Sequence, residues 1–71
     1  MKKEYVINMK DVAERIVHSF GTVDEIMLRL LQEKGAPVIG NFAPTVAPGW
    51  SVFREENIAD RSIKFTFEKL E

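Results

Sequence analysis

Residues 35–50 constrain the fold of this chain more than any other segment. They read Gly-Ala-Pro-Val-Ile-Gly-Asn-Phe-Ala-Pro-Thr-Val-Ala-Pro-Gly-Trp and carry no charge, although 30% of the residues in the chain are charged. All three prolines, three of the four glycines and the only tryptophan lie in this apolar segment. Proline interrupts helices and central strands, and side chains this apolar need cover from water. The cover can come from the protein's own core, from a second copy or from a partner protein.

The composition bounds the size of the core and the kinds of site. With 71 residues we expect one domain over residues 1–71, and a chain this short builds only a thin core. The absence of cysteine excludes disulfides and thiolate metal sites, and a single histidine excludes a multi-histidine cage. We therefore expect no metal and no cofactor. The sequence shows neither a membrane-spanning run nor a signal peptide, which leads us to expect a cytoplasmic protein without membrane contact.

Two amphipathic helices are predicted over residues 9–20 and 23–34, because apolar residues recur there at helical spacing. The apolar stripes consist of Val12, Ala13, Ile16, Val17 and Phe20 in the first helix, and of Val23, Ile26, Met27, Leu30 and Leu31 in the second. In the first helix, Asp11 and Arg15 are four residues apart, and this spacing predicts a pair on a solvated face. Leu28 lies off the second stripe, so it either fills a gap or faces outward.

The ends of both helices carry specific signals. Asn8 is a candidate N-cap for the first helix, and Gly21 is suited to end it in the left-handed conformation. Thr22 and Glu25 have the spacing of a capping box at the start of the second helix. Gly35 then ends that helix, and Pro37 prevents its continuation.

Four strands are predicted around the helices. Residues 4–8, 38–46 and 50–54 read as strands, the second of them irregular because glycine and proline interrupt it. Ala47-Pro48-Gly49-Trp50 has the signature of a type II turn. Residues 61–70 give the clearest strand, because Ile63, Phe65 and Phe67 alternate with polar residues and predict one buried and one wet face.

These elements predict an α+β fold with the order β-α-α-β-β-β. We expect a small three- or four-stranded antiparallel sheet with a two-helix hairpin packed on one face. In this arrangement Ile63, Phe65 and Phe67 meet the helices in the core, through Val12, Ile16, Phe20, Ile26, Leu30 and Leu31.

The sequence does not favour an enzyme. His18 is the only imidazole, and its helical position places it opposite the apolar stripe, where an exposed histidine is expected. Asp24/Glu25 and Glu55/Glu56 are adjacent pairs, and adjacent side chains in a helix or strand do not converge on one substrate. We therefore expect no catalytic residues and no small-molecule substrate.

The helix pair 9–34 has the outline of a DNA-reading motif, so a nucleic-acid-associated regulator is the alternative function. The charges do not favour DNA binding, since the first turn of the second helix carries Asp24 and Glu25, and only Arg29 and Lys34 are basic on that helix. A net charge of −1 also makes nucleic acid an unfavourable partner.

The leading hypothesis is a non-enzymatic protein–protein interaction module, such as a small adaptor, regulator or inhibitor. It uses the apolar segment and the sheet face that the helices leave open. Its partner is another protein, a second copy of the chain, or both. The expected partner-binding residues are Trp50, Phe42, Phe53 and Leu28, because large apolar side chains make the strongest anchors in protein interfaces.

Overall fold

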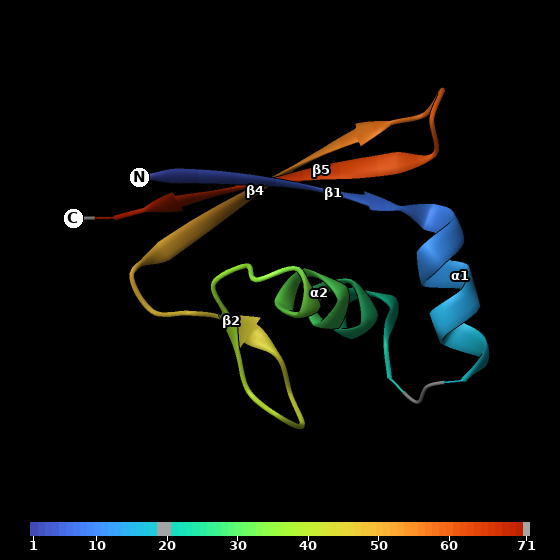
Figure 1. Cartoon of the computed structure of the whole chain (residues 1–71), viewed down its shortest axis with the longest axis horizontal. Coiled ribbons are helices and arrows are strands. Elements are labelled where there is room, and N and C mark those ends of the chain that lie inside the picture. Colours follow the sequence, from blue (N-terminus) through green and yellow to red (C-terminus); the bar gives the residue numbers. More distant parts are fainter. Residues whose placement is uncertain (19–20, 71) are drawn as a thin grey trace.

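A three-stranded antiparallel sheet forms the upper layer of the computed structural model, which describes residues 1–18 and 21–70 (Figure 1). Its strands are β1 (Lys2–Asn8), β4 (Trp50–Asn57) and β5 (Ser62–Lys69), in the order β1-β5-β4. The pairings keep one register from end to end, so the alternation along β5 is transmitted to both neighbours. The predicted α+β class is confirmed, and β5 lies at the centre of the sheet.

Both helices lie on the same side of this sheet (Figure 1). Helix α1 (Met9–Val17) continues directly from β1, and α2 (Val23–Glu33) runs beneath the sheet. The predicted helix starts are confirmed, because Asn8 Oδ1 accepts from the backbone N–H of Lys10 at 2.9 Å and Thr22 Oγ1 accepts from that of Glu25 at 3.2 Å. The predicted end of the second helix is confirmed, because Gly35 follows its C-cap Lys34 with a positive φ of 91°. The prediction that Gly21 ends the first helix is wrong, because α1 already ends at Val17 with His18 as its C-cap.

The core lies between the inner face of the sheet and α2. Its buried side chains come from every element except β3 and β4, and they are Ile7, Val12, Ile26, Met27, Leu31, Ala36, Val38, Ile63, Phe65 and Phe67. Tyr5 adds an edge-to-face contact with Phe67, with the ring centroids 5.7 Å apart. The three alternating residues of β5 are thus core residues, as predicted.

Helix α1 contributes less to this core than its sequence predicts. Of the stripe residues that the structure describes, only Val12 is buried, whereas Ile16 is exposed and Val17 is 76% exposed. The physical reason is position, because α1 stands at the end of β1 and not beneath the sheet (Figure 1). The predicted helix extends to residue 20, and its last two residues, Ser19 and Phe20, lie outside the described part of the chain.

Residues 38–46 form a separate hairpin and not the single irregular strand that was predicted. Strand β2 (Val38–Ile39) pairs with β3 (Thr45–Val46) in an antiparallel two-stranded sheet. Gly40 turns the chain with a φ of 107°, a conformation that side-chain-bearing residues rarely adopt. The hairpin therefore packs beside α2 instead of adding a fourth strand to the main sheet (Figure 1).

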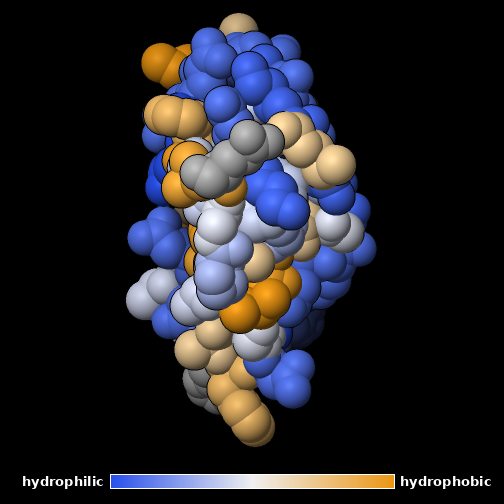
Figure 2. All heavy atoms as spheres, turned by 90° about the vertical axis from the view of Figure 1, so that its left-hand side faces the viewer, coloured by the Kyte–Doolittle hydropathy of each residue, from blue (hydrophilic) through white to orange (hydrophobic). Residues whose placement is uncertain are grey.

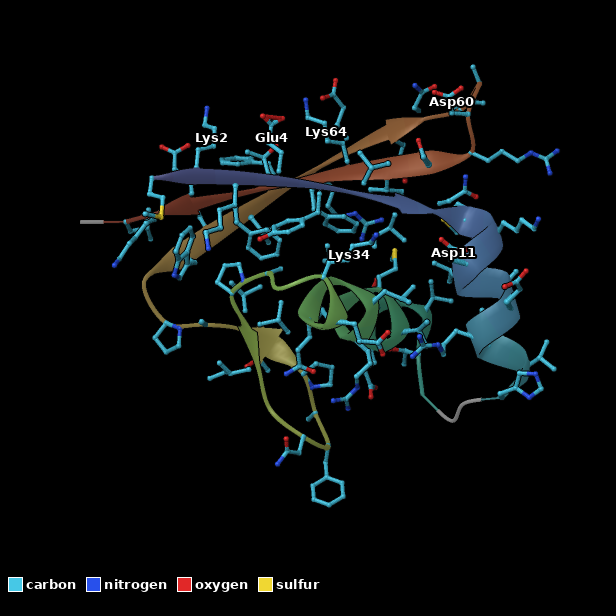
Figure 3. The ribbon with its side chains drawn as sticks, in the orientation of Figure 1. Lys2, Glu4, Asp11, Lys34, Asp60 and Lys64 are labelled. Atoms are coloured by element: carbon cyan, nitrogen blue, oxygen red, sulfur yellow. The ribbon has the colours of Figure 1, made fainter. Side chains whose placement is uncertain are left out.

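The outer face of the main sheet points away from the helices and is mostly polar. Lys2, Glu4 and Lys64 project from it (Figure 3), and Lys64 Nζ lies 3.0 Å from Glu4 Oε2. This hydrogen bond raises the pKa of Lys64. The upper part of Figure 2, which corresponds to this face, is largely hydrophilic. Val6 and Phe53 are exposed there on strands separated by β5, so they do not form a continuous apolar patch.

Candidate functional site

The four residues predicted to bind a partner lie in four different environments. Trp50 is on the inner face of β4, half-buried against the core, with Lys3 Nζ 5.9 Å from its ring centroid. Leu28 is also half-buried, in a small cavity between α2, β3 and β4. Phe53 lies on the outer sheet face and is 64% exposed. Phe42 lies in the turn of the β2–β3 hairpin and is 96% exposed. The fold therefore does not bring these side chains together in one surface.

Two polar residues of α2 hold the β2–β3 hairpin in place. Gln32 Nε2 donates to the carbonyl oxygens of Val38 and Gly40, at 3.2 and 3.1 Å. Arg29 donates to the carbonyl oxygens of Gly40 and Phe42, at 3.2 and 3.4 Å, and also to Oε1 of Gln32 at 3.2 Å. The two side chains are one helical turn apart and therefore face the same way. They fix three carbonyls of an otherwise irregular turn.

The turn that carries Phe42 is anchored on its other side by apolar contacts. Val38 and Pro44 are buried, and Val46 packs against the core. The N–H of Ala47 donates to the carbonyl of Pro37 at 2.9 Å and closes the base of the hairpin. Part of the apolar segment is therefore covered by the protein itself, while the tip of the hairpin is hydrophobic and projects at the lower end of the molecule (Figure 2).

A second surface lies at the opposite end of the molecule, between α2 and the far half of β4. It is an open groove of about 400 Å³. Met9, Val23, Met27 and Ile63 give it an apolar lining. The adjoining cavity of about 190 Å³ shares Met27 and contains Leu28, Val46 and Val52. Methionine side chains adapt to different apolar shapes, so this groove suits an apolar side chain from outside the chain.

Charged side chains line the β4 side of this groove. Arg54 lies 3.5 Å from Asp24 of α2 and 3.8 Å from Glu56 on its own strand. All three side chains are substantially exposed to solvent, and contacts of this length between exposed groups contribute little to stability. Arg54 is therefore free to exchange these acids for a closer one at small cost.

The groups that carry general acid–base or metal chemistry do not converge in this fold. His18 is exposed directly after α1, as its place in the sequence predicted. Within residues 1–18 and 21–70, no group of three or more histidine, aspartate or glutamate residues is placed to hold a metal ion. In the same ranges no helix is both long and apolar enough to cross a membrane.

Sequence reasoning missed the function of Arg29 and Gln32, because it considered Arg29 only as a basic charge on the second helix. A usable signal was present: two long side chains with N–H donors, three residues apart, precede an uncharged segment whose backbone carbonyls need donors. It also missed the groove beside β4, whose lining comes from segments far apart in the sequence.

Comparisons with protein-family models, with curated proteins and with solved structures found no match to this chain.

Proposed function

We propose that this protein is a non-enzymatic protein–protein interaction module that presents Phe42 to a partner protein. One observation carries the proposal: an aromatic side chain that is 96% exposed stands on a turn fixed by side-chain hydrogen bonds from α2. An isolated exposed apolar residue is ordinary, but a braced one loses little conformational entropy on binding. Aromatic side chains also form the centres of many protein interfaces.

The surroundings of Phe42 support the same function. Ile39 is half exposed on the same hairpin and adds apolar surface next to the turn. The turn itself carries no charge, so a partner can bury it without having to neutralise an ion. The chain contains no cysteine, and this composition suits the reducing cytoplasm as the place where such a module acts.

Fewer observations support the alternative function, a nucleic-acid-associated regulator. Arg29 is committed to hairpin carbonyls, and the first turn of α2 carries Asp24 and Glu25. Helix α2 also lies between the sheet and the hairpin, where it is not free to enter a groove of DNA (Figure 1).

The experiment replaces Phe42 by a photo-crosslinking phenylalanine analogue in the cells that make this protein. We expect irradiation to produce one discrete protein adduct. Its mass identifies the class of partner, since an adduct of twice 8.1 kDa contains a second copy of the chain. The matched control carries the analogue at Val17, an exposed apolar position at the end of α1, and it should not give this adduct.

A second variant tests the role of the brace. Arg29→Ala removes two donors to the turn, so we expect the adduct at position 42 to become weaker although the fold persists. No adduct at position 42, or the same adduct from both positions, would contradict the proposed function.

A further inference from the structure

Strand β4 is an edge of the main sheet, and half of its backbone groups point away from β5. The order is β1-β5-β4, and the N–H of Leu70 donates to the carbonyl of Gly49 at 2.7 Å. Antiparallel pairs alternate between bonded and non-bonded, so the backbone groups of Val52, Arg54 and Glu56 are directed outward. Among residues 1–18 and 21–70, no strand pairs with this side of β4.

The two edges of the sheet differ in how well they resist strand addition. Edge strands are commonly protected by lysine or proline, and β1 carries Lys2 and Lys3. Strand β4 has the sequence Trp-Ser-Val-Phe-Arg-Glu-Glu-Asn and contains neither residue. The open groove begins beneath Arg54 and continues past Asn57, so no element of the fold covers this half of the strand.

We propose that a second copy of this chain pairs with β4 in antiparallel fashion, about a two-fold axis at Glu55, to form a continuous six-stranded sheet. The charges of β4 favour this register. It places Arg54 of each copy opposite Glu56 of the other on the inner face, so that two intermolecular ion pairs form. The hydrogen bonds come from the outward backbone groups, as in other cases of strand addition.

The apolar side chains near the end of β4 also favour the register centred on Glu55. Ile58 follows β4 directly and is 88% exposed. In the dimer it lies opposite Val52 of the second copy, which lines the small cavity together with Leu28 and Val46. The association therefore covers a large apolar side chain that the single chain leaves in water.

Neighbouring registers fit less well. Centring the axis on Arg54 sets two guanidinium groups opposite each other, and centring it on Phe53 leaves Arg54 opposite Val52. The Glu55 register does bring two carboxylates together on the outer face. Each Glu55 is, however, the cross-strand neighbour of Lys64, whose ammonium group offsets the repulsion.

The dimer rests on the proposed function only in that both are associations between proteins, because the hairpin tip takes no part in it. Phe42→Ala therefore leaves the dimer intact while it removes binding at the tip. If the unaltered chain forms no dimer but still crosslinks through position 42, only this inference is defeated. If it forms the dimer but gives no crosslink through position 42, only the proposed function is defeated.

Charge reversal tests the register directly. Sedimentation over about 1 to 300 µM covers the affinity range of weak to moderate interfaces, and we expect a concentration-dependent dimer of the unaltered chain. Arg54→Glu and Glu56→Arg should each weaken it at least about tenfold in Kd, because each places like charges opposite one another. Mixing the two variants should restore dimers, which then contain one chain of each kind with both pairs complementary.

The mixture is decisive, because neither variant can form an attractive contact between positions 54 and 56 with another copy of itself. As a second readout, the amides of Val52, Arg54 and Glu56 should become protected from hydrogen exchange as the concentration of the unaltered chain rises. A chain that stays monomeric throughout the range overturns the proposal. A dimer that both variants leave unchanged also overturns it, and so does a mixture that remains monomeric.

Discussion

Trp50 shows how the fold decides the surroundings of a single residue. As the only tryptophan, in an apolar segment, it was a natural candidate for an interface anchor. Its position on the inner face of β4 instead packs it against the core, beneath Lys3. Phe42 of the same segment is instead exposed, because the turn of the hairpin directs it into solvent.

The two aromatic residues should therefore differ in their effect on stability. We expect Trp50→Ala to lower the free energy of unfolding by about 2 kcal/mol, less than for a fully buried tryptophan, because the side chain is only half-buried. Phe42→Ala should change it by less than about 0.5 kcal/mol, since the ring contacts mostly water. Urea unfolding of both variants measures the difference. Equal losses of stability would mean that Phe42 packs against the protein.

Gly40 is the residue on which the hairpin turn depends. A Cβ atom at this position would lie 2.5 Å from the carbonyl oxygen of Ala43, and the φ of 107° is itself unfavourable for other residues. We expect Gly40→Ala to destabilise the protein by roughly 1–3 kcal/mol and to shift the NMR signals of Val38 and Val46. Gly35→Ala is the matched control, because φ is also positive there but nothing lies within 4 Å of the added methyl. A larger effect at Gly35 would contradict this reason.

At the scale of elements, what the sequence predicted well was local. The alternation along β5 and the caps at Asn8 and Thr22 depend on residues near each other in the chain, and all were confirmed. What it missed depends on distant partners. The hairpin needs donors from Arg29 and Gln32, and no pattern within residues 38–46 reveals them. The four candidate binding residues lie apart for the same reason, because the exposure of each depends on elements elsewhere in the chain.

The junction of α1 and α2 illustrates a further long-range contact. Arg15 was expected to pair with Asp11 on its own helix, but it forms two hydrogen bonds with Glu33 of α2, at 2.8 and 2.9 Å. Val12 is the only buried residue of α1, so this ion pair is one of the main contacts that hold the second half of α1 against α2. The hydrogen bond from Arg15 lowers the pKa of Glu33.

The direction of this pKa shift predicts how the contribution of the Arg15–Glu33 ion pair to stability depends on pH. A carboxyl group with a lower pKa in the folded state stabilises the protein at neutral pH, and this contribution disappears as the pH falls through the folded-state pKa. Glu33→Gln should therefore lower the urea midpoint slightly near pH 7 and have no effect below about pH 3. In the Arg15→Gln background the substitution should matter at neither pH. A deficit that persists in acid would show that Glu33 acts through packing.

The whole molecule is thin, with extents of 38 × 31 × 16 Å. The main sheet and the helical layer enclose a small core in which few side chains are fully buried, as expected for a chain of this size. Stability is then concentrated where layers overlap, along β5 and α2. The two surfaces that we propose for association lie at the two ends of the molecule, where the hairpin tip and the far half of β4 extend beyond that overlap (Figure 1).

This distribution predicts a gradient of amide hydrogen exchange across the chain. Strand β5 is paired on both sides and carries Ile63, Phe65 and Phe67, so its amides should open only with global unfolding and exchange slowest. The amides of α1 should exchange much faster than those of β5, because that helix buries one side chain and lies outside the overlap of the layers. Exchange followed by NMR in dilute solution measures both. If α1 exchanged as slowly as β5, the helix would be held by contacts that its exposed Ile16 and Val17 do not make in a single chain, and these residues would themselves become candidates for an interface.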